Sequence, residues 1–214
     1  MKKGRIFEFE NRPAVTAWAS VVGPVEGKGP LGKGFDIVLE DEMCGMKTWE
    51  EAESNLQKTA LKLLLDKACI KDTDVDGIFA GDLLNQCMGS GFGIRDFRIP
   101  FCGIYGACST SVLSMIQAAV YVNCGMMETA VSSTSSHFCS AEKQFRFPLE
   151  YGGQRTPTAQ RTVTGASSAL ISSKNKQNRP VIEKAIIGMV KDKGIKDANN
   201  MGAAMAPVNV KHRL

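Results

Sequence analysis

The sequence has no long hydrophobic run and no signal-peptide pattern. No apolar stretch reaches the roughly 18 to 20 residues that a membrane-spanning helix needs. The basic start, residues 1–3, is followed by Glu8 and Glu10, where a signal peptide would carry its apolar core. We therefore expect a chain that stays on the cytoplasmic side, without a transmembrane segment.

Metal, disulfide and nucleic-acid signals are also missing. The seven cysteines form no CxxC pair and no zinc-ligand spacing, and an odd number fits a disulfide framework badly, so we expect free thiols, no metal and no cofactor. The 26 basic and 22 acidic residues are scattered, and the net charge of +4 is mild. The sequence therefore shows no basic patch that would indicate nucleic-acid binding. The glycine-rich segment 27–34 nearly matches a phosphate-binding loop, but Gly34 replaces the Ser or Thr that would hold magnesium.

Apolar segments alternate with helical patterns, which is typical of layered α/β proteins. At 214 residues, of which 43% are apolar, the chain can bury a substantial core. Thr48 and Glu51 form a capping-box pattern that predicts the start of an amphipathic helix. Segment 89–93 is interpreted as a flexible glycine-rich loop. Strands are expected at residues 14–22, 75–80, 99–104, 129–133 and 168–172.

The most informative segment is 99–123, which indicates a short strand, a turn of small residues and a helix. Cys108 lies in this turn. Backbone N–H groups and the helix dipole favour a thiolate at the first turn of a helix, so the position suits a nucleophile. Gly106 and Ala107 would let the backbone turn sharply. Most lone cysteines are buried small hydrophobic residues, and this alternative stays open.

These residues resemble the thiolase-like superfamily, in particular the β-ketoacyl synthases that initiate fatty acid synthesis. In those proteins the nucleophile lies in an Ala-Cys-Ser turn, which residues 107–109 match. The helix, glycine stop and strand that follow, and the small-residue strand at 164–171, also resemble this superfamily. The resemblance implies an α/β fold of the thiolase-like, layered α-β-α kind.

Four segments carry a narrower resemblance: WASVVGP at 18–24, GKGFD at 32–36, SSHF at 135–138 and MGAAMAP at 201–207. They are similar to one family within this superfamily, that of stage V sporulation protein AD. This resemblance implies a non-catalytic protein that binds dipicolinic acid, with calcium, for uptake into the developing spore. It also implies other proteins of the spore membrane channel complex as partners, a homodimer at full length, and a peripheral location at the forespore inner membrane.

The thiolase-like fold has two similar halves, and the second half supplies the histidine and asparagine of a catalytic site. Residues 1–174 are expected to form the first half, 175–180 a polar linker, and 181–214 the start of a truncated second half. Because the resemblance is lost at 208–214, His212 is not assigned a catalytic role.

Three side chains are candidates for ligand binding. His137 follows a predicted strand amid serines, so it is either a solvated surface residue or a neighbour of the Cys108 pocket, where the carboxyl ends of strands gather. Arg155 and Arg161 flank a Thr-Pro-Thr loop, and arginine binds carboxylates bidentately, as a dicarboxylate ligand requires. Surface solvation of both arginines is the alternative.

Two functions therefore compete. In the first, Cys108 marks the floor of a pocket that binds dipicolinic acid. In the second, an acyltransferase, the Cys108 thiolate attacks an acyl thioester while its own backbone N–H stabilises the oxyanion. The family resemblance favours the first, and composition and spacing alone do not separate them.

Overall fold

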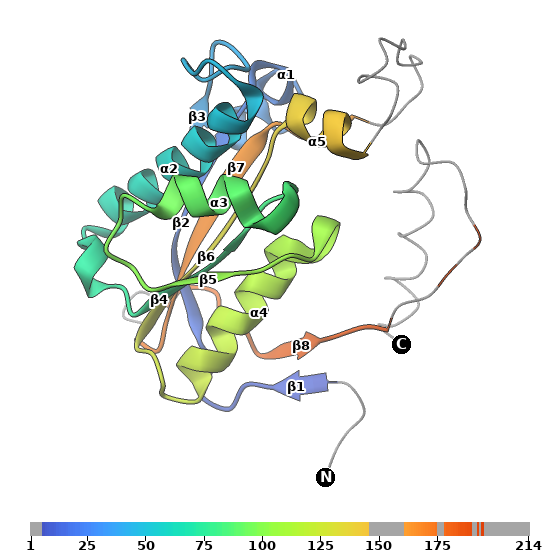
Figure 1. Ribbon diagram of the computed structural model, residues 1–214. Coiled ribbons are helices and arrows are strands. Elements are labelled where there is room, and N and C mark those ends of the chain that lie inside the picture. Colours follow the sequence, from blue (N-terminus) through green and yellow to red (C-terminus); the bar gives the residue numbers. More distant parts are fainter. Residues whose placement is uncertain (1–5, 146–160, 175–177, 190–191, 193, 195–214) are drawn as a thin grey trace.

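The computed structural model describes residues 6–145, 161–174, 178–189, 192 and 194 (Figure 1). Its main feature is a six-stranded sheet in the order β3-β2-β7-β6-β4-β5. β7 runs antiparallel to both of its neighbours, and the other pairs are parallel. The strands are β2 (Ala14–Val22), β3 (Ile37–Val38), β4 (Gly77–Gly81), β5 (Phe101–Gly103), β6 (Thr129–Ser136) and β7 (Gly165–Ser172).

The sheet lies between two layers of helices. Alternate residues of a strand point to opposite faces, so Ile78 packs with α2 (Trp49–Ala68) whereas its neighbour Phe79 packs with α4 (Thr110–Asn123). Helix α3 (Met88–Ile94) lies beside α2 on the same side of the sheet. The expected α-β-α layering is therefore confirmed.

The predicted start of α2 is confirmed. The Thr48 side chain accepts the Glu51 backbone N–H at 3.2 Å, and the Glu51 carboxylate accepts the Thr48 N–H at 3.2 Å. This reciprocal cap satisfies two donors that a helix otherwise leaves unpaired. It fixes the end of α2 that lies above the carboxyl ends of the parallel strands.

The interpretation of segment 89–93 as a flexible loop is wrong, because these residues form most of α3. Their glycines serve close packing. A Cβ at Gly93 would lie 2.7 Å from the Ser54 backbone oxygen of α2, and one at Gly89 would lie 3.1 Å from the Asp82 carboxyl carbon. The glycine-rich segment before β3 is also compact: it contains α1 (Pro24–Gly27), and a Cβ at Gly32 would lie 1.9 Å from the Gly27 oxygen.

The segment after the expected linker is hydrogen-bonded to the start of the chain. β8 (Lys184–Ile186) pairs antiparallel with β1 (Ile6–Glu8), and a bridge joins Ala14 to Val181. Ala185 is buried with Phe9 against α4. The interpretation of 181–214 as the start of a second half stays a prediction, but its first described residues pack on the first half.

Helix α5 (Phe138–Phe145) follows β6 directly and contacts α2. In the described part of the chain, no helix has the length and apolar character needed to cross a membrane.

Candidate functional site at the carboxyl edge of the sheet

Three parallel strands end at one edge of the sheet and place three polar turns there. β4, β5 and β6 are in register, so their last residues, Gly81, Gly103 and Ser136, lie at the same edge (Figure 1). Open α/β sheets bind ligands at this edge, because the loops that leave the strands diverge there. Asp82, Cys108 and His137 each lie in the chain that leaves one of these strands.

Cys108 lies where the sequence predicted, at the entrance to a helix. Residues Ala107–Ser109 form a 3₁₀ turn that continues directly into α4, and the Cys108 side chain is exposed. The turn is fixed by hydrogen bonds: the Gly106 N–H donates to Thr110 Oγ1 at 3.0 Å, and that hydroxyl donates to the Ala107 oxygen at 2.8 Å. The thiol is therefore held by a rigid backbone and is open to reagents and ligands.

Ala107, rather than Gly106, carries the unusual backbone conformation in this turn. Its φ is +45°, a left-handed value that costs an L-residue roughly 1–2 kcal/mol, whereas Gly106 has φ −143°. Gly106 is needed for space, since a Cβ there would lie 2.8 Å from Ser109 Oγ. Such strain is often stored at functional sites, and here it lies next to the exposed Cys108.

We predict that iodoacetamide alkylates Cys108 about two- to fivefold faster than Cys69 or Cys124. All three thiols are exposed, but Cys69 caps the carboxyl end of α2 and Cys124 that of α4, where the helix dipole disfavours a thiolate. Peptide mapping after brief labelling measures the order. Equal labelling of the three cysteines would show that the turn does not activate its sulfur.

His137 is buried, which corrects its interpretation as a surface residue. Its side chain has 0% exposure. Nε2 lies 2.7 Å from the Glu42 backbone oxygen, and Nδ1 accepts the Cys139 N–H at 3.2 Å. Since Nδ1 is an acceptor, Nε2 carries the proton and donates it to Glu42. Both ring nitrogens are thus used by the protein.

Arg161 is held by the same glutamate that anchors His137. Its Nη2 forms an ion pair with Glu42 Oε1, its Nε lies 4.0 Å from Glu26 Oε1, and its Cζ lies 4.0 Å from the Phe138 ring centroid. The structure therefore brings His137 and Arg161 together, through opposite ends of Glu42. Arg155, the other candidate, falls outside the described residues.

Buried carboxyl groups at this edge, among them Asp82 and Glu53, were not predicted from the sequence. Asp82 accepts the backbone N–H groups of Leu84 at 2.8 Å and Ser90 at 2.6 Å. Glu53, on α2, accepts hydroxyl hydrogen bonds from Ser140 at 2.6 Å and Ser135 at 3.4 Å. Burial raises the Glu53 pKa to about 7, with Asp82 adding to the shift. The sequence signal for a buried Glu53 was its place on the apolar face of the predicted helix.

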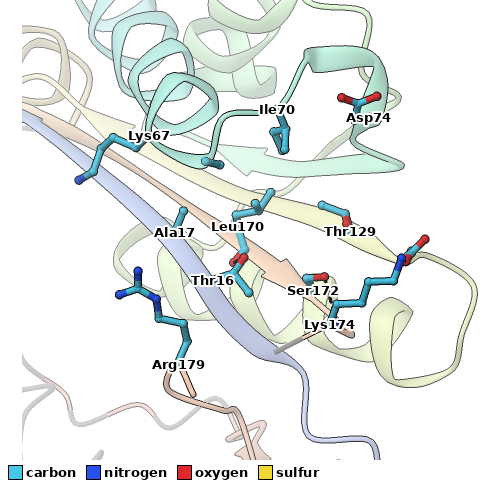
Figure 2. Close-up of a pocket in the computed structure, with 12 residues that line it drawn as sticks. Thr16, Ala17, Lys67, Ile70, Asp74, Thr129, Leu170, Ser172, Lys174 and Arg179 are labelled. Atoms are coloured by element: carbon cyan, nitrogen blue, oxygen red, sulfur yellow. Dashed lines mark hydrogen bonds and ion pairs between the residues drawn. The ribbon is translucent and has the colours of Figure 1, made fainter. Parts of the chain in front are cut away.

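The opposite edge of the sheet carries a separate open cavity of about 560 Å³ (Figure 2). Its floor is formed by Ala17 and Leu170, and its rim carries Lys67, Lys174 and Arg179. Lys67 is paired with Asp36 at 2.8 Å, Lys174 with Glu128, and the Arg179 guanidinium lies 5.7 Å from the Trp18 ring. These cations are engaged by the protein, so the cavity is a weaker candidate than the edge with Cys108.

No group of three or more metal-ligating side chains comes together within the described ranges. An ion bound there would need ligands from elsewhere or from the bound molecule itself.

Sequence comparison identifies a sporulation family. Residues 3–212 match the family described as stage V sporulation protein AD. The chain is 41% identical over 199 residues to stage V sporulation protein AD of Bacillus subtilis (strain 168), a match that covers 93% of this chain and 58% of that protein. The chain thus spans less than two thirds of the length of this curated relative.

Comparison with solved structures confirms the thiolase-like fold. The chain is similar to 3-oxoacyl-(acyl-carrier-protein) synthase III from Aquifex aeolicus VF5, with TM-score 0.51, 14% identity, and coverage of 77% of this chain and 55% of that chain. A variant of OleA from Xanthomonas campestris gives TM-score 0.52, 13% identity, and coverage of 78% and 59%. At these identities the likeness concerns the fold alone.

Proposed function

The chain belongs to the family of stage V sporulation protein AD, and we propose that it forms the thiolase-like part of a sporulation protein that binds dipicolinic acid, with calcium, for uptake into the developing spore. The observation that carries the proposal is the family match over nearly the whole chain. The full protein would be a homodimer that works with other proteins of the spore membrane channel complex, peripheral to the forespore inner membrane.

We place the ligand at the carboxyl edge of the sheet, beside the exposed Cys108 turn. Arg161 provides a guanidinium suited to a carboxylate. Since Glu42 and Glu26 already lie against it, a dicarboxylate would have to displace at least one of these glutamates. His137 then supports the site indirectly by holding the Glu42 backbone.

One observation favours the second function, acyl transfer. Cys108 is exposed at the start of α4, as a thiolate nucleophile should be, and the chain shares its fold with 3-oxoacyl synthases. The one histidine of the described ranges, His137, uses both ring nitrogens within the protein, at Glu42 and Cys139, so it does not serve as a base for Cys108. A binding role needs no general base, and this favours the first function.

We predict that the chain binds pyridine-2,6-dicarboxylate at least about tenfold more tightly than acetyl-coenzyme A, a difference of about 1.4 kcal/mol. Isothermal titration calorimetry with each ligand, with and without Ca²⁺, measures both affinities. Cys108→Ala is the matched control, and it should retain dicarboxylate binding within a few-fold, because a non-catalytic pocket does not need the thiolate.

Mass spectrometry of the protein after incubation with acetyl-coenzyme A tests the acyltransferase alternative directly. A stable mass increase of one acetyl group on Cys108, absent from Cys108→Ala, would establish acyl transfer chemistry and reverse the ranking of the two functions.

A further inference from the structure

Glu53 occupies an unusual position for a carboxyl group. It lies on the second turn of α2, has 0% exposure, and faces the start of α5. A buried carboxylate is costly unless a cation or several hydrogen-bond donors compensate it. In the described ranges, no lysine, arginine or histidine forms an ion pair with Glu53.

The groups around Glu53 compensate a negative charge only in part. Its donors are the hydroxyls of Ser140 and Ser135 and the backbone of Leu83. Asp82, in the turn after β4, adds a negative potential. Gln57, one turn further along the same helix, is fully buried, and neither polar atom of its amide has a hydrogen-bond partner among the described residues. Burial outweighs these donors and raises the pKa of Glu53 to about 7, so the neutral acid is favoured below this pH.

The other charged groups nearby have partners other than Glu53. On α2, Glu50 pairs with Lys143 of α5 at 3.2 Å, which neutralises both at the surface. Glu142 of α5 is buried and accepts the Thr162 hydroxyl at 3.1 Å. His137, before α5, is bound to the Glu42 backbone. None of these groups supplies a free positive charge to Glu53.

The same carboxyl group holds α5 in place. Ser140 of α5 reaches Glu53 at 2.6 Å, and this bond and the Glu50–Lys143 pair join α5 to α2. An exposed ion pair contributes little, typically below 1 kcal/mol. The buried Ser140–Glu53 contact is therefore the main polar link between the two helices.

From this geometry we infer that Glu53 is a proton-controlled latch: its neutral carboxyl group holds α5 against α2, and loss of its proton to solvent releases α5. When α5 moves away, water reaches the carboxylate and removes the cost of burying it beside Asp82. Because α5 lies at the same sheet edge as the Cys108 turn, release would open this edge. The inference does not depend on which ligand the edge binds.

The direction of the pH response follows from the pKa of Glu53. This pKa is about 7 in the closed arrangement and near its ordinary value of 4.5 once the group is solvated. The closed arrangement thus binds the proton more tightly, so it is favoured at low pH. Between about pH 5 and pH 7 the opening equilibrium rises by up to about tenfold per pH unit, and above pH 7 it levels off.

Hydrogen exchange of the α5 amides, followed by mass spectrometry and corrected for intrinsic exchange rates, tests the latch on the whole 214-residue chain. We expect α5 protection to fall more than about tenfold from pH 5 to pH 7 in the wild type and to stay constant in Glu53→Gln. The matched control, Glu50→Gln, keeps the wild-type pH step, since Glu50 is partly exposed and pairs only at the surface. The α4 amides report global unfolding and should exchange more slowly than α5 throughout.

Any of the following results would overturn the inference: a wild-type α5 without the pH step, the same step in Glu53→Gln, or α5 amides that exchange together with those of α4. If Glu53→Gln does not retain α4 protection, Ser140→Ala replaces it. This variant keeps Glu53 but removes its link to α5, so it should raise α5 exchange at pH 5 and leave α4 unchanged. Unchanged α5 exchange in Ser140→Ala would also contradict the latch.

Discussion

Replacing His137 by alanine is expected to lower the free energy of unfolding by about 3 to 5 kcal/mol. The imidazole is fully buried, so its removal leaves a cavity, and the Glu42 carbonyl and the Cys139 N–H both lose a hydrogen-bond partner. Since the Glu42 side chain also holds Arg161, the loss should loosen the loop before α2 and the start of β7 together.

Urea denaturation, followed by far-ultraviolet circular dichroism, measures this effect. Lys58→Ala is a suitable control, because the Lys58–Asp96 ion pair is about half exposed and its loss should change stability by less than about 1 kcal/mol. If His137→Ala unfolds at the wild-type midpoint but loses dicarboxylate binding, His137 contacts the ligand and its interpretation as a structural residue is wrong.

The elements that are determined by local sequence signals could be predicted from the sequence. β2 is observed with the bounds that its apolar pattern predicted, and the capping box placed the start of α2. The turn at Cys108 was found for the same reason, since small residues between an apolar strand and a helical pattern leave few alternatives. These features are fixed by neighbours within a few residues.

Elements that depend on distant partners were missed or misplaced. α3 is rich in glycine, which disfavours isolated helices, and it forms where close packing on α2 needs residues without side chains. β7 begins at Gly165, three residues earlier than expected from 168–172, because β2 and β6 pair with it on both sides. Propensity alone does not reveal such pairing.

The residues of the candidate site also divide into those set by local sequence and those set by distant partners. The position of Cys108 at the entrance to a helix could be predicted, because it depends on a local turn. The roles of His137 and Arg161 could not, because their shared partner Glu42 lies 95 and 119 residues away in the sequence. The helical position of Glu53 indicated burial but not its partners, since Ser140 and Asp82 reach it from separate elements. Tertiary contacts, rather than residue type, decide which polar groups at this edge are free for ligands.

Gly81, the last residue of β4, should be the least replaceable residue beneath the Cys108 turn. A Cβ there would lie 1.9 Å from the Ile104 oxygen and 2.6 Å from Thr110 Cγ2, so alanine cannot fit unless β5 or the turn moves. The Ile104 oxygen belongs to backbone that is itself fixed, because the Ile104 N–H donates to the Ala80 oxygen at 2.8 Å. We therefore expect Gly81→Ala to cost about 3 kcal/mol or more.

Gly91→Ala is the matched control for this substitution. Gly91 lies inside α3 with open space around its would-be Cβ, so alanine should stabilise the chain by up to about 1 kcal/mol. Urea denaturation of both variants gives the two free energies, and iodoacetamide labelling reports the turn itself: displaced backbone in Gly81→Ala should change the Cys108 rate while Cys69 is unaffected. Equal midpoints for the wild type and Gly81→Ala, with an unchanged Cys108 rate, would show that the close contact between β4 and the Cys108 turn does not hold in solution.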